Sequence, residues 1–463
     1  MSNLLENFAK SKHRSTLILL FDVIICAVLL KILPFDPLAN RGLVLLVFAG
    51  ILWLTEAYHI TVTALMIPVI AILGGMLDTK AAFATFSEPI IFMFFGGFVL
   101  AAILQIQQLD QVLASQLLKL SKGGLKKTVW LLFAATTFLS MWINNTAVAA
   151  MMLPLTMGLL SGLDSKINHR TYAYVLLGVA FSANIGGIGT LVGSAPNAIL
   201  ASQLDIDFAE WLKFGMPVML LLLPSMLFAL HVVLKPDLSG TVSLQLDKIE
   251  FDTTKTITLA VFLLTVILLC FGSLINPVLS GILGLADKIK NFDSVVVMLA
   301  IAVLMIAKTA TWQQVQQRTE WGVLMLFGGG LTLSIVLKDT GASAILADTI
   351  VSFVGQAHWL VIMLSLTAFI VFLTEFTSNT ASAALLMPIF IAVANSLGVS
   401  EISLAAIIAC GASCAFMLPI ATPPNAIVFA TGHIRQQEMV RVGLILNLCA
   451  IAIIGGLAYA FWR

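Results

Sequence analysis

The chain is 463 residues long, 60% of them hydrophobic and only 10% charged, with a formal net charge of +1. Soluble domains carry roughly 25% charged residues, so this composition excludes an ordinary soluble protein, and the balanced charge argues against a nucleic-acid partner. Many stretches approach the roughly 20 apolar residues that cross a bilayer, where lipid would cover them. The sequence therefore predicts an all-α polytopic membrane protein.

The apolar segments follow one another in two comparable series. The first series begins with a leader span at 16–34 and continues at 42–57, 60–77, 89–107, 128–160, 172–207 and 212–235. After a polar loop, the second series runs through 256–275, 293–308, 321–337, 358–396, 404–431 and 438–461. Polar motifs interrupt two segments of each series, "NNT" and "GSAPN" in the first, "SNT" and "ATPPN" in the second.

The two series carry the same motifs in the same order. "LSMWINNTAVAAMMLP", from Leu139, matches "LTEFTSNTASAALLMP", from Leu373, with seven of sixteen positions identical. "SEPIIFMFFGGF", from Ser87, matches "TEWGVLMLFGGG", from Thr319, and "GSAPNAI" matches "ATPPNAI". The three offsets are 234, 232 and 228 residues. Duplication of a whole half explains this better than chance similarity between apolar helices.

The segments interrupted by "NNT" and "SNT" are longer than one crossing needs, which predicts re-entrant hairpins at about 128–160 and 358–396. About 11 crossings then remain, one in the leader and five per half, so the second half is inverted relative to the first. With the N-terminus in the cytoplasm, 16 of the 24 Lys and Arg residues fall inside, as the positive-inside rule favours.

These features predict four regions along the chain. We expect an N-terminal leader and first transmembrane helix at 1–40 and a first inverted repeat at 41–240. A cytoplasmic loop at 241–255 and a second inverted repeat at 256–463 follow. Each repeat would contain one re-entrant hairpin and one discontinuous helix.

A helix broken at membrane depth exposes N–H and C=O groups that must find partners, so the breaks predict a polar cavity. Helix N-termini suit an anion, whereas unwound carbonyls with Ser, Thr and Asn oxygens suit a hard cation such as Na⁺. Neither tip motif contains Lys or Arg. An anion there would depend on amides, hydroxyls and a co-bound cation, although the same residues also predict ordinary helix capping.

Other features have competing interpretations. Glu375, beside the second tip, is either a proton-coupling carboxylate or, as we prefer, a hydrogen-bonding group that packs the hairpin. The glycines of "FGGF" and "FGGG" favour close helix packing. Closed hairpin tips disfavour a passive anion channel. The sequence shows no P-loop, HExxH or Ser/His/Asp arrangement, so we expect neither an enzyme nor an ATP-driven pump.

The paired motifs resemble those of the divalent anion:sodium symporter family, above all its INDY-type bacterial sodium/dicarboxylate transporters. The resemblance rests on "NNTAVAAMMLP" with "GSAPNA" and on "TEFTSNTASAALLMP" with "PIATPPNAIVFA", and it covers essentially the whole chain. It implies a homodimer in the bacterial cytoplasmic (inner) membrane, with a scaffold and a transport domain that moves as an elevator. It also implies Na⁺-coupled uptake of C4-dicarboxylates such as succinate, malate or fumarate. The alternatives are a sodium-coupled sulfate or tricarboxylate (citrate) carrier and a dicarboxylate exchanger.

The resemblance also implies which residues form the site. The first Na⁺ site would use Ser140, Asn144, Asn145 and Gly193. The second would use Thr374, Thr377, Asn379 and Ala421. The dicarboxylate would lie among Asn144, Asn145, Thr146, Ser194, Ser378, Asn379, Thr380, Thr422 and Pro424. The family's tips typically read Ser-Asn-Thr, so Asn144 leaves the substrate preference and the geometry of the first Na⁺ site open.

Overall fold

The computed structural model describes residues 12–121, 123–164, 167–241, 251–354 and 358–462. Regular structure in these ranges is helical, apart from one isolated β-bridge between Gly124 and Thr241. Parts of the predicted leader and central loop, 1–11 and 242–250, lie outside them. So do four of the lysines that support the predicted orientation, Lys10, Lys122, Lys166 and Lys248.

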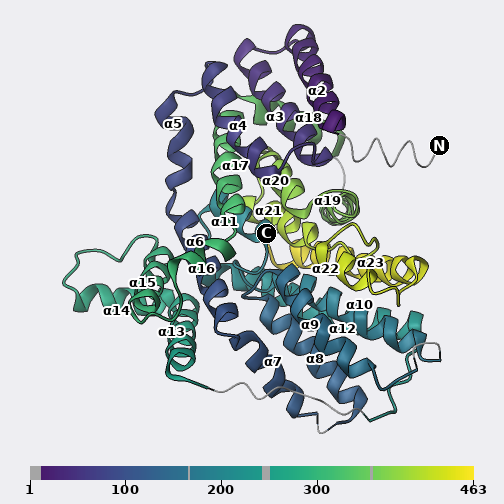
Figure 1. Ribbon diagram of the computed structural model, residues 1–463. Coiled ribbons are helices and arrows are strands. Elements are labelled where there is room, and N and C mark those ends of the chain that lie inside the picture. The colour runs from purple at the N-terminus through teal and green to yellow at the C-terminus, as the bar shows by residue number, and fades with distance from the viewer. Residues whose placement is uncertain (1–11, 122, 165–166, 242–250, 355–357, 463) are drawn as a thin grey trace.

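The helices fall before and after the central loop (Figure 1). Those before it are α2 (Lys12–Ile32), α3 (Pro37–Thr55), α4 (Ile60–Leu73), α5 (Thr79–Ala84), η1 (Thr85–Ser87), α6 (Pro89–Ile106), α7 (Leu109–Lys119), α8 (Leu125–Ser140), α9 (Asn145–Leu160), α10 (His169–Ile188), α11 (Ala195–Leu204) and α12 (Phe208–Leu234). Those after it are α13 (Thr253–Cys270), α14 (Gly272–Ile282), α15 (Phe292–Ile306), α16 (Trp312–Arg318), α17 (Trp321–Asp339), α18 (Ala342–Val354), α19 (Trp359–Leu373), α20 (Asn379–Leu397), α21 (Glu401–Ala412), α22 (Pro423–Phe429) and α23 (Gln436–Phe461).

In the described part of the chain, 9 helices are long and apolar enough to cross a membrane. Large apolar side chains remain exposed on such helices, for example Phe21 on α2, which is 63% exposed. Lipid is the medium that removes this surface from water. The helices α4 and α15, which the sequence predicts to be crossings, have only 14 and 15 residues, whereas the hairpin arm α20 reaches 19. Helix length alone therefore does not reproduce the expected 11 crossings.

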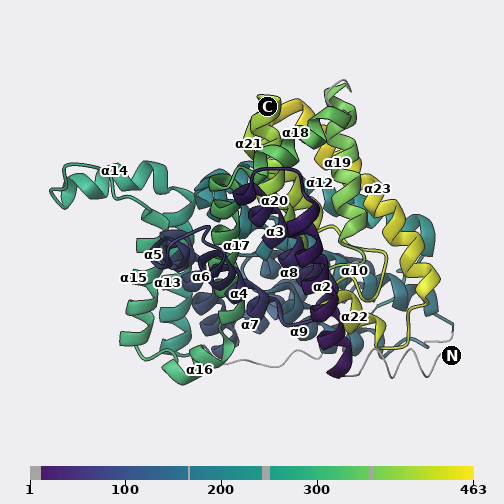
Figure 2. The same ribbon diagram turned by 90° about the horizontal axis from the view of Figure 1, so that it is seen from above.

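The two halves interlock rather than forming separate bodies (Figure 1). Helix α4 of the first half packs on α17 of the second, and α6 packs on α15. Likewise α12 packs on α23, and α11 packs on α20 and α21. Figure 2 shows α14 projecting sideways from the body beside α13 and α15. Any site made by the broken helices is therefore assembled from both halves.

Glycines allow the helix pairs α4–α17 and α6–α15 to approach closely. A Cβ atom on Gly329 would lie 2.4 Å from the backbone oxygen of Ala64, and one on Gly96 would lie 2.4 Å from a side-chain carbon of Val297. Real Cβ atoms do not come this close, so the packing interpretation of "FGGF" and "FGGG" is confirmed at these positions. Among the described residues, nothing beyond the backbone of its own helix and its chain neighbours lies within 4 Å of the same atom built on Gly330.

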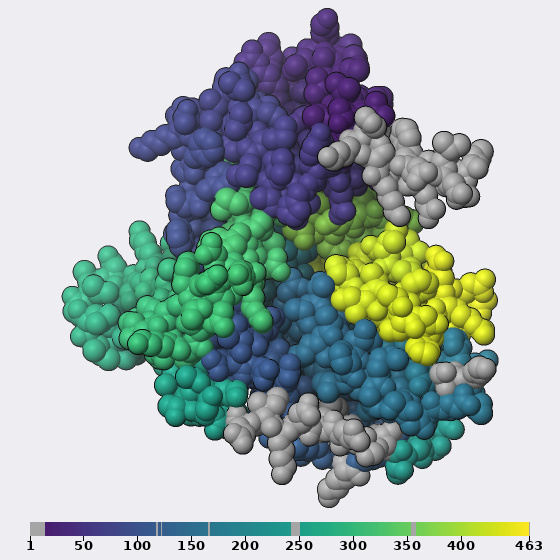
Figure 3. All heavy atoms as spheres, viewed as in Figure 1, coloured from purple at the N-terminus to yellow at the C-terminus, as the bar shows by residue number. Residues whose placement is uncertain are grey.

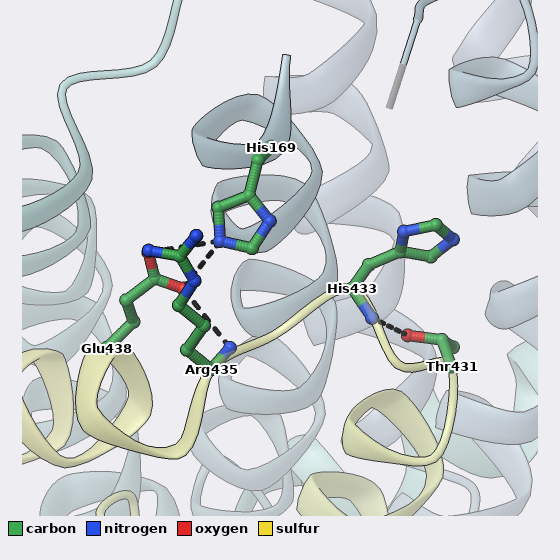
Figure 4. A network of polar contacts seen from close by, with 5 residues as sticks. All are labelled: His169, Thr431, His433, Arg435 and Glu438. Carbon is green, nitrogen blue, oxygen red and sulfur yellow. Dashed lines mark hydrogen bonds and ion pairs between the residues drawn. The ribbon is translucent and has the colours of Figure 1, made fainter. Parts of the chain in front are cut away.

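A polar network ties the start of α10 to the start of α23, one helix from each half (Figure 4). His169 Nε2 lies 3.0 Å from Glu438 Oε2, and that oxygen accepts the backbone N–H of Arg435 at 3.1 Å. Nearby, the backbone N–H of His433 donates to Thr431 Oγ1 at 3.4 Å. The network holds one end of α10 against the second half, while the other end of α10 leads to the site described next.

Candidate functional site

Two helical hairpins, α8–α9 and α19–α20, turn at the Asn-Thr motifs. Their non-helical turns cover 141–144 and 374–378. At the first turn, Asn144 Oδ1 accepts the backbone N–H of Thr146 at 2.8 Å. At the second turn, Ser378 Oγ accepts the backbone N–H of Ala381 at 3.5 Å. Both residues are thus N-caps, and the capping interpretation is confirmed. The caps also fix where the N-terminus of each following helix points.

Two further helices are interrupted near the proline motifs. The first interruption separates α10 from α11 at 189–194, close to "GSAPN" as predicted. The second separates α21 from α22 at 413–422, so α21 ends well before the "ATPPN" motif, where the sequence predicts the break. The longer unwound stretch exposes more backbone, and its amides need partners inside the protein.

One asparagine braces each interruption in the same way. Asn197 Nδ2 donates to the backbone oxygens of Gly187 at 2.9 Å and Thr190 at 2.8 Å. Asn425 Nδ2 donates to the backbone oxygens of Ala415 at 3.0 Å and Leu418 at 3.1 Å. All three atoms of the second brace are offset by 228 positions from those of the first. The motif repeat in the sequence is therefore also a repeat of hydrogen bonds.

The hairpin turns and the interruptions meet at one cavity of about 1060 Å³. All nine residues predicted to surround the anion line it: Asn144, Asn145, Thr146, Ser194, Ser378, Asn379, Thr380, Thr422 and Pro424. Of the other predicted Na⁺ ligands, Gly193, Thr377 and Ala421 also line it, whereas Ser140 and Thr374 are fully buried and do not. Figure 3 shows this face hollowed near its centre, between the purple N-terminal helices and the yellow C-terminal segment.

Behind the first turn, oxygen atoms surround one end of the Asn145 amide. Ser140 Oγ lies 2.6 Å from Asn145 Oδ1 and 2.7 Å from the backbone oxygen of Ala183. With the amide turned over, Nδ2 takes this place, 2.6 Å from Ser140 Oγ, 3.1 Å from Ala183 O and 3.3 Å from Gly193 O. A nitrogen at this position donates to three oxygens. An oxygen at this position instead joins a cluster of four, which is the kind of environment a hard cation prefers.

The second turn repeats much of this arrangement. Thr374 Oγ1 is hydrogen-bonded to Asn379 Oδ1 and lies 3.0 Å from the backbone oxygen of Ala412. Thr374 and Asn379 are offset by 234 positions from Ser140 and Asn145. Thr377, also expected in the second Na⁺ site, has its hydroxyl 2.6 Å from Ser382 Oγ.

The first turn contacts the second half of the chain through Asn144, the residue that departs from the Ser-Asn-Thr tip motif. Asn144 Nδ2 donates to Glu320 Oε1, just before α17, at 3.3 Å. Serine, the residue expected here from the resemblance, has a hydroxyl on a shorter side chain and no amide that could donate to this carboxylate. The departure noted in the sequence thus creates a cross-half contact at the edge of the cavity.

Sequence reasoning missed two residues of this region. Asn184 of α10 is 2% exposed, and its Nδ2 lies 3.0 Å from Thr422 Oγ1, which joins the first half to the second interruption. An asparagine inside an apolar segment was an available signal. Arg14 of α2 lines the cavity as well. Nothing in its local sequence marks it, because only the fold brings the N-terminal helix to this place.

Comparison with known proteins gives concordant matches. The family model described as "Citrate transporter" (CitMHS) matches residues 50–402 and 288–463. An "Uncharacterized transporter" of Haemophilus influenzae is 53% identical over 97% of this chain and 98% of its own length. A "Sodium-dependent dicarboxylate transporter SdcS" of Staphylococcus saprophyticus is 31% identical over 98% of this chain and 92% of its own.

One solved structure shares the fold at low sequence identity. It is the crystal structure of the YdaH transporter of Alcanivorax borkumensis, with a TM-score of 0.58 and 15% identity, and the match covers 97% of this chain and 98% of that one. The SdcS relative is named as a sodium-dependent dicarboxylate transporter, in line with the resemblance found in the sequence motifs. The matching family model is instead named for citrate. The protein is an integral membrane protein and a secondary transporter, not an enzyme, and the chain belongs to the citrate transporter (CitMHS) family.

Proposed function

We propose that this protein couples Na⁺ to the uptake of C4-dicarboxylates such as succinate, malate and fumarate across the bacterial cytoplasmic membrane. The observation that carries the proposal is the meeting of both hairpin turns and both interruptions at one cavity. Helices α9 and α20 begin there, so their free N–H groups favour a bound carboxylate. Helices α8, α10, α19 and α21 end near it, and residues at or near these ends supply the hydroxyl and carbonyl oxygens of the clusters around Asn145 and Asn379.

The clusters suggest how the cation and the anion depend on each other. Without Na⁺, the Asn145 amide satisfies the oxygens of Ser140, Ala183 and Gly193 with its nitrogen. With Na⁺ among these oxygens, the amide oxygen must face the cation, which frees the nitrogen to donate to a carboxylate. The cation also adds a positive charge to walls that offer amides and hydroxyls together with one arginine, Arg14, and one carboxylate, Glu56. Each ligand therefore improves the site of the other.

The wider architecture belongs to the same proposal. The matching asparagine braces support inverted repeats at 41–240 and 256–463, with α8–α9 and α19–α20 as re-entrant hairpins. The glycine-packed pairs α4–α17 and α6–α15 suit a rigid scaffold, against which the hairpins and broken helices move as an elevator. We further propose a homodimer surrounded by membrane lipid, with the N-terminus in the cytoplasm.

Radiolabelled succinate uptake into proteoliposomes tests the proposal. Uptake should be fast with an inward Na⁺ gradient, slow when K⁺ replaces Na⁺, and blocked by excess unlabelled malate. Uptake that is independent of Na⁺ but requires dicarboxylate inside the vesicle would identify an exchanger and contradict sodium coupling.

Citrate is the second candidate substrate, because the matching family model carries that name. Asn144 adds a longer hydrogen-bond donor where the related tips have serine, which suits a substrate with an additional polar group. Unlabelled citrate and sulfate belong in the same assay. If citrate suppresses uptake more strongly than malate, the substrate is the tricarboxylate.

A further inference from the structure

Glu375 is a buried carboxylate between the second hairpin and the second interruption. It is 1% exposed. Its Oε1 accepts the backbone N–H groups of Phe416 at 2.8 Å and Met417 at 2.9 Å, and its Oε2 accepts that of Leu418 at 3.1 Å. Asn447 Nδ2 of α23 also donates to Oε1, at 2.7 Å. The hydrogen-bonding role expected for Glu375 is thereby confirmed.

The four partners of Glu375 are all donors, which matches the ionised carboxylate. A protonated carboxyl group would carry an O–H that needs an acceptor, which the three backbone N–H groups cannot provide. Several N–H bonds to a carboxylate stabilise its charged form. The arrangement therefore favours a negative charge on Glu375 inside the protein.

Glu375 adjoins the second oxygen cluster in the chain. Glu375 follows Thr374 in the chain, and the amides that it binds belong to the unwound stretch leading to Ala421. The corresponding position of the first half is Met141, an apolar residue whose backbone oxygen accepts the hydroxyl of Thr190 instead. The two clusters thus share neutral oxygen ligands and differ in whether a carboxylate supports them.

We propose that Glu375 is a positioning residue that makes the second cation site bind Na⁺ more tightly than the first. The inference rests on the sodium coupling proposed above. The carboxylate holds the backbone of the interruption in place, and its charge attracts a cation strongly where water is excluded. Na⁺ then occupies the cluster of Thr374 and Asn379 first. The cluster of Ser140 and Asn145 fills at higher Na⁺ concentration, together with the anion.

Sodium-dependent thermal stabilisation of the purified full-length protein, without substrate, tests this inference. Glu375→Gln keeps the shape and removes the charge, so the Na⁺ concentration for half-maximal stabilisation should rise about tenfold, which corresponds to about 1.4 kcal/mol. Glu375→Asp keeps the charge on a shorter side chain, so its half-maximal Na⁺ concentration should lie between those of the wild type and Glu375→Gln. Glu401→Gln, in the first turn of α21, is the matched control and should behave like the wild type.

Asn447→Ala separates the charge from the packing. It removes one donor and leaves the carboxylate with its three backbone bonds, so the melting temperature should fall. The half-saturating Na⁺ concentration should stay within about twofold of the wild type, because the carboxylate keeps its charge. A rise in this variant as large as that expected for Glu375→Gln would assign the effect to packing and overturn the inference. This variant also decides the matter if Glu375→Gln does not fold.

The same thermal stabilisation experiment distinguishes an error in this inference from an error in the proposed function. If the wild type responds to Na⁺ and Glu375→Gln responds at the same concentration, the charge is unimportant and sodium coupling still stands. If the wild type itself does not respond to Na⁺, both the coupling and this inference are wrong.

Discussion

The two broken helices of this transporter are held by matching asparagine side chains, but only the second has a carboxylate beside its interruption. In each half, one asparagine donates to two carbonyls across the interruption, at Asn197 and again at Asn425. Beside the second interruption Glu375 accepts four N–H groups, while the first half has Met141 at that position. The shared brace preserves the geometry of a duplicated site, and the unshared carboxylate makes its two copies unequal.

The largest expected effect comes from removing the paired tip asparagines. Asn145→Ala and Asn379→Ala should each reduce succinate uptake by about 100-fold or more, because a hydrogen bond to a charged group is worth about 1.5–3 kcal/mol and, in the proposed site, each residue contacts both the cation and the anion. Proteoliposome uptake at equal reconstituted protein measures this. Near-normal uptake with normal sodium dependence in either variant would remove that residue from the site.

A smaller, symmetric effect should follow from removing the braces. Asn197→Ala and Asn425→Ala each leave two carbonyls without their side-chain donor inside the protein, at a cost of about 1–3 kcal/mol. The melting temperatures of the two purified variants should fall by similar amounts. Asn395→Ala, at an exposed position near the end of α20, is the control. A large loss in one brace variant and none in the other would contradict the equivalence of the two interruptions.

The smallest effect tests the one difference between the hairpin tips. Asn144→Ser makes the first tip read like the second and removes the bond to Glu320, which is worth about 1 kcal/mol or less at this exposed position. Uptake should persist, with a severalfold change in the ratio of succinate to citrate inhibition. Glu320→Gln serves as the comparison, because it retains an acceptor for Asn144 without the charge. An unchanged ratio in Asn144→Ser would show that this position does not read the anion.

Much of the architecture was predictable because membrane insertion constrains the sequence strongly. Apolar segments, polar interruptions and a motif repeat located both hairpins within a few residues, and all nine predicted anion residues line one cavity. The braces of Asn197 and Asn425 were harder to foresee, since their carbonyl partners are backbone atoms that every residue possesses. The role of Glu375 could be guessed only as hydrogen bonding, since its partners lie about 40 residues further along the chain.

Other features could not be read from local sequence. The early end of α21 at Ala412 comes seven residues before the nearest proline, Pro419. Glu375 and Asn425 bind the unwound backbone there instead. Arg14 reaches the cavity through the packing of the N-terminal helix. Packing between segments that lie far apart in the sequence decides both, and such packing is a property of the folded chain.

The most direct test is calorimetric titration of the purified protein with succinate, with and without Na⁺, using Asn379→Ala as the control. If the cation completes the anion site, succinate should bind the wild type in Na⁺, and its affinity should drop at least about tenfold when K⁺ replaces Na⁺. The Asn379→Ala variant should bind poorly in both conditions. Equal succinate affinity in Na⁺ and K⁺ would contradict the dependence of the anion on the cation.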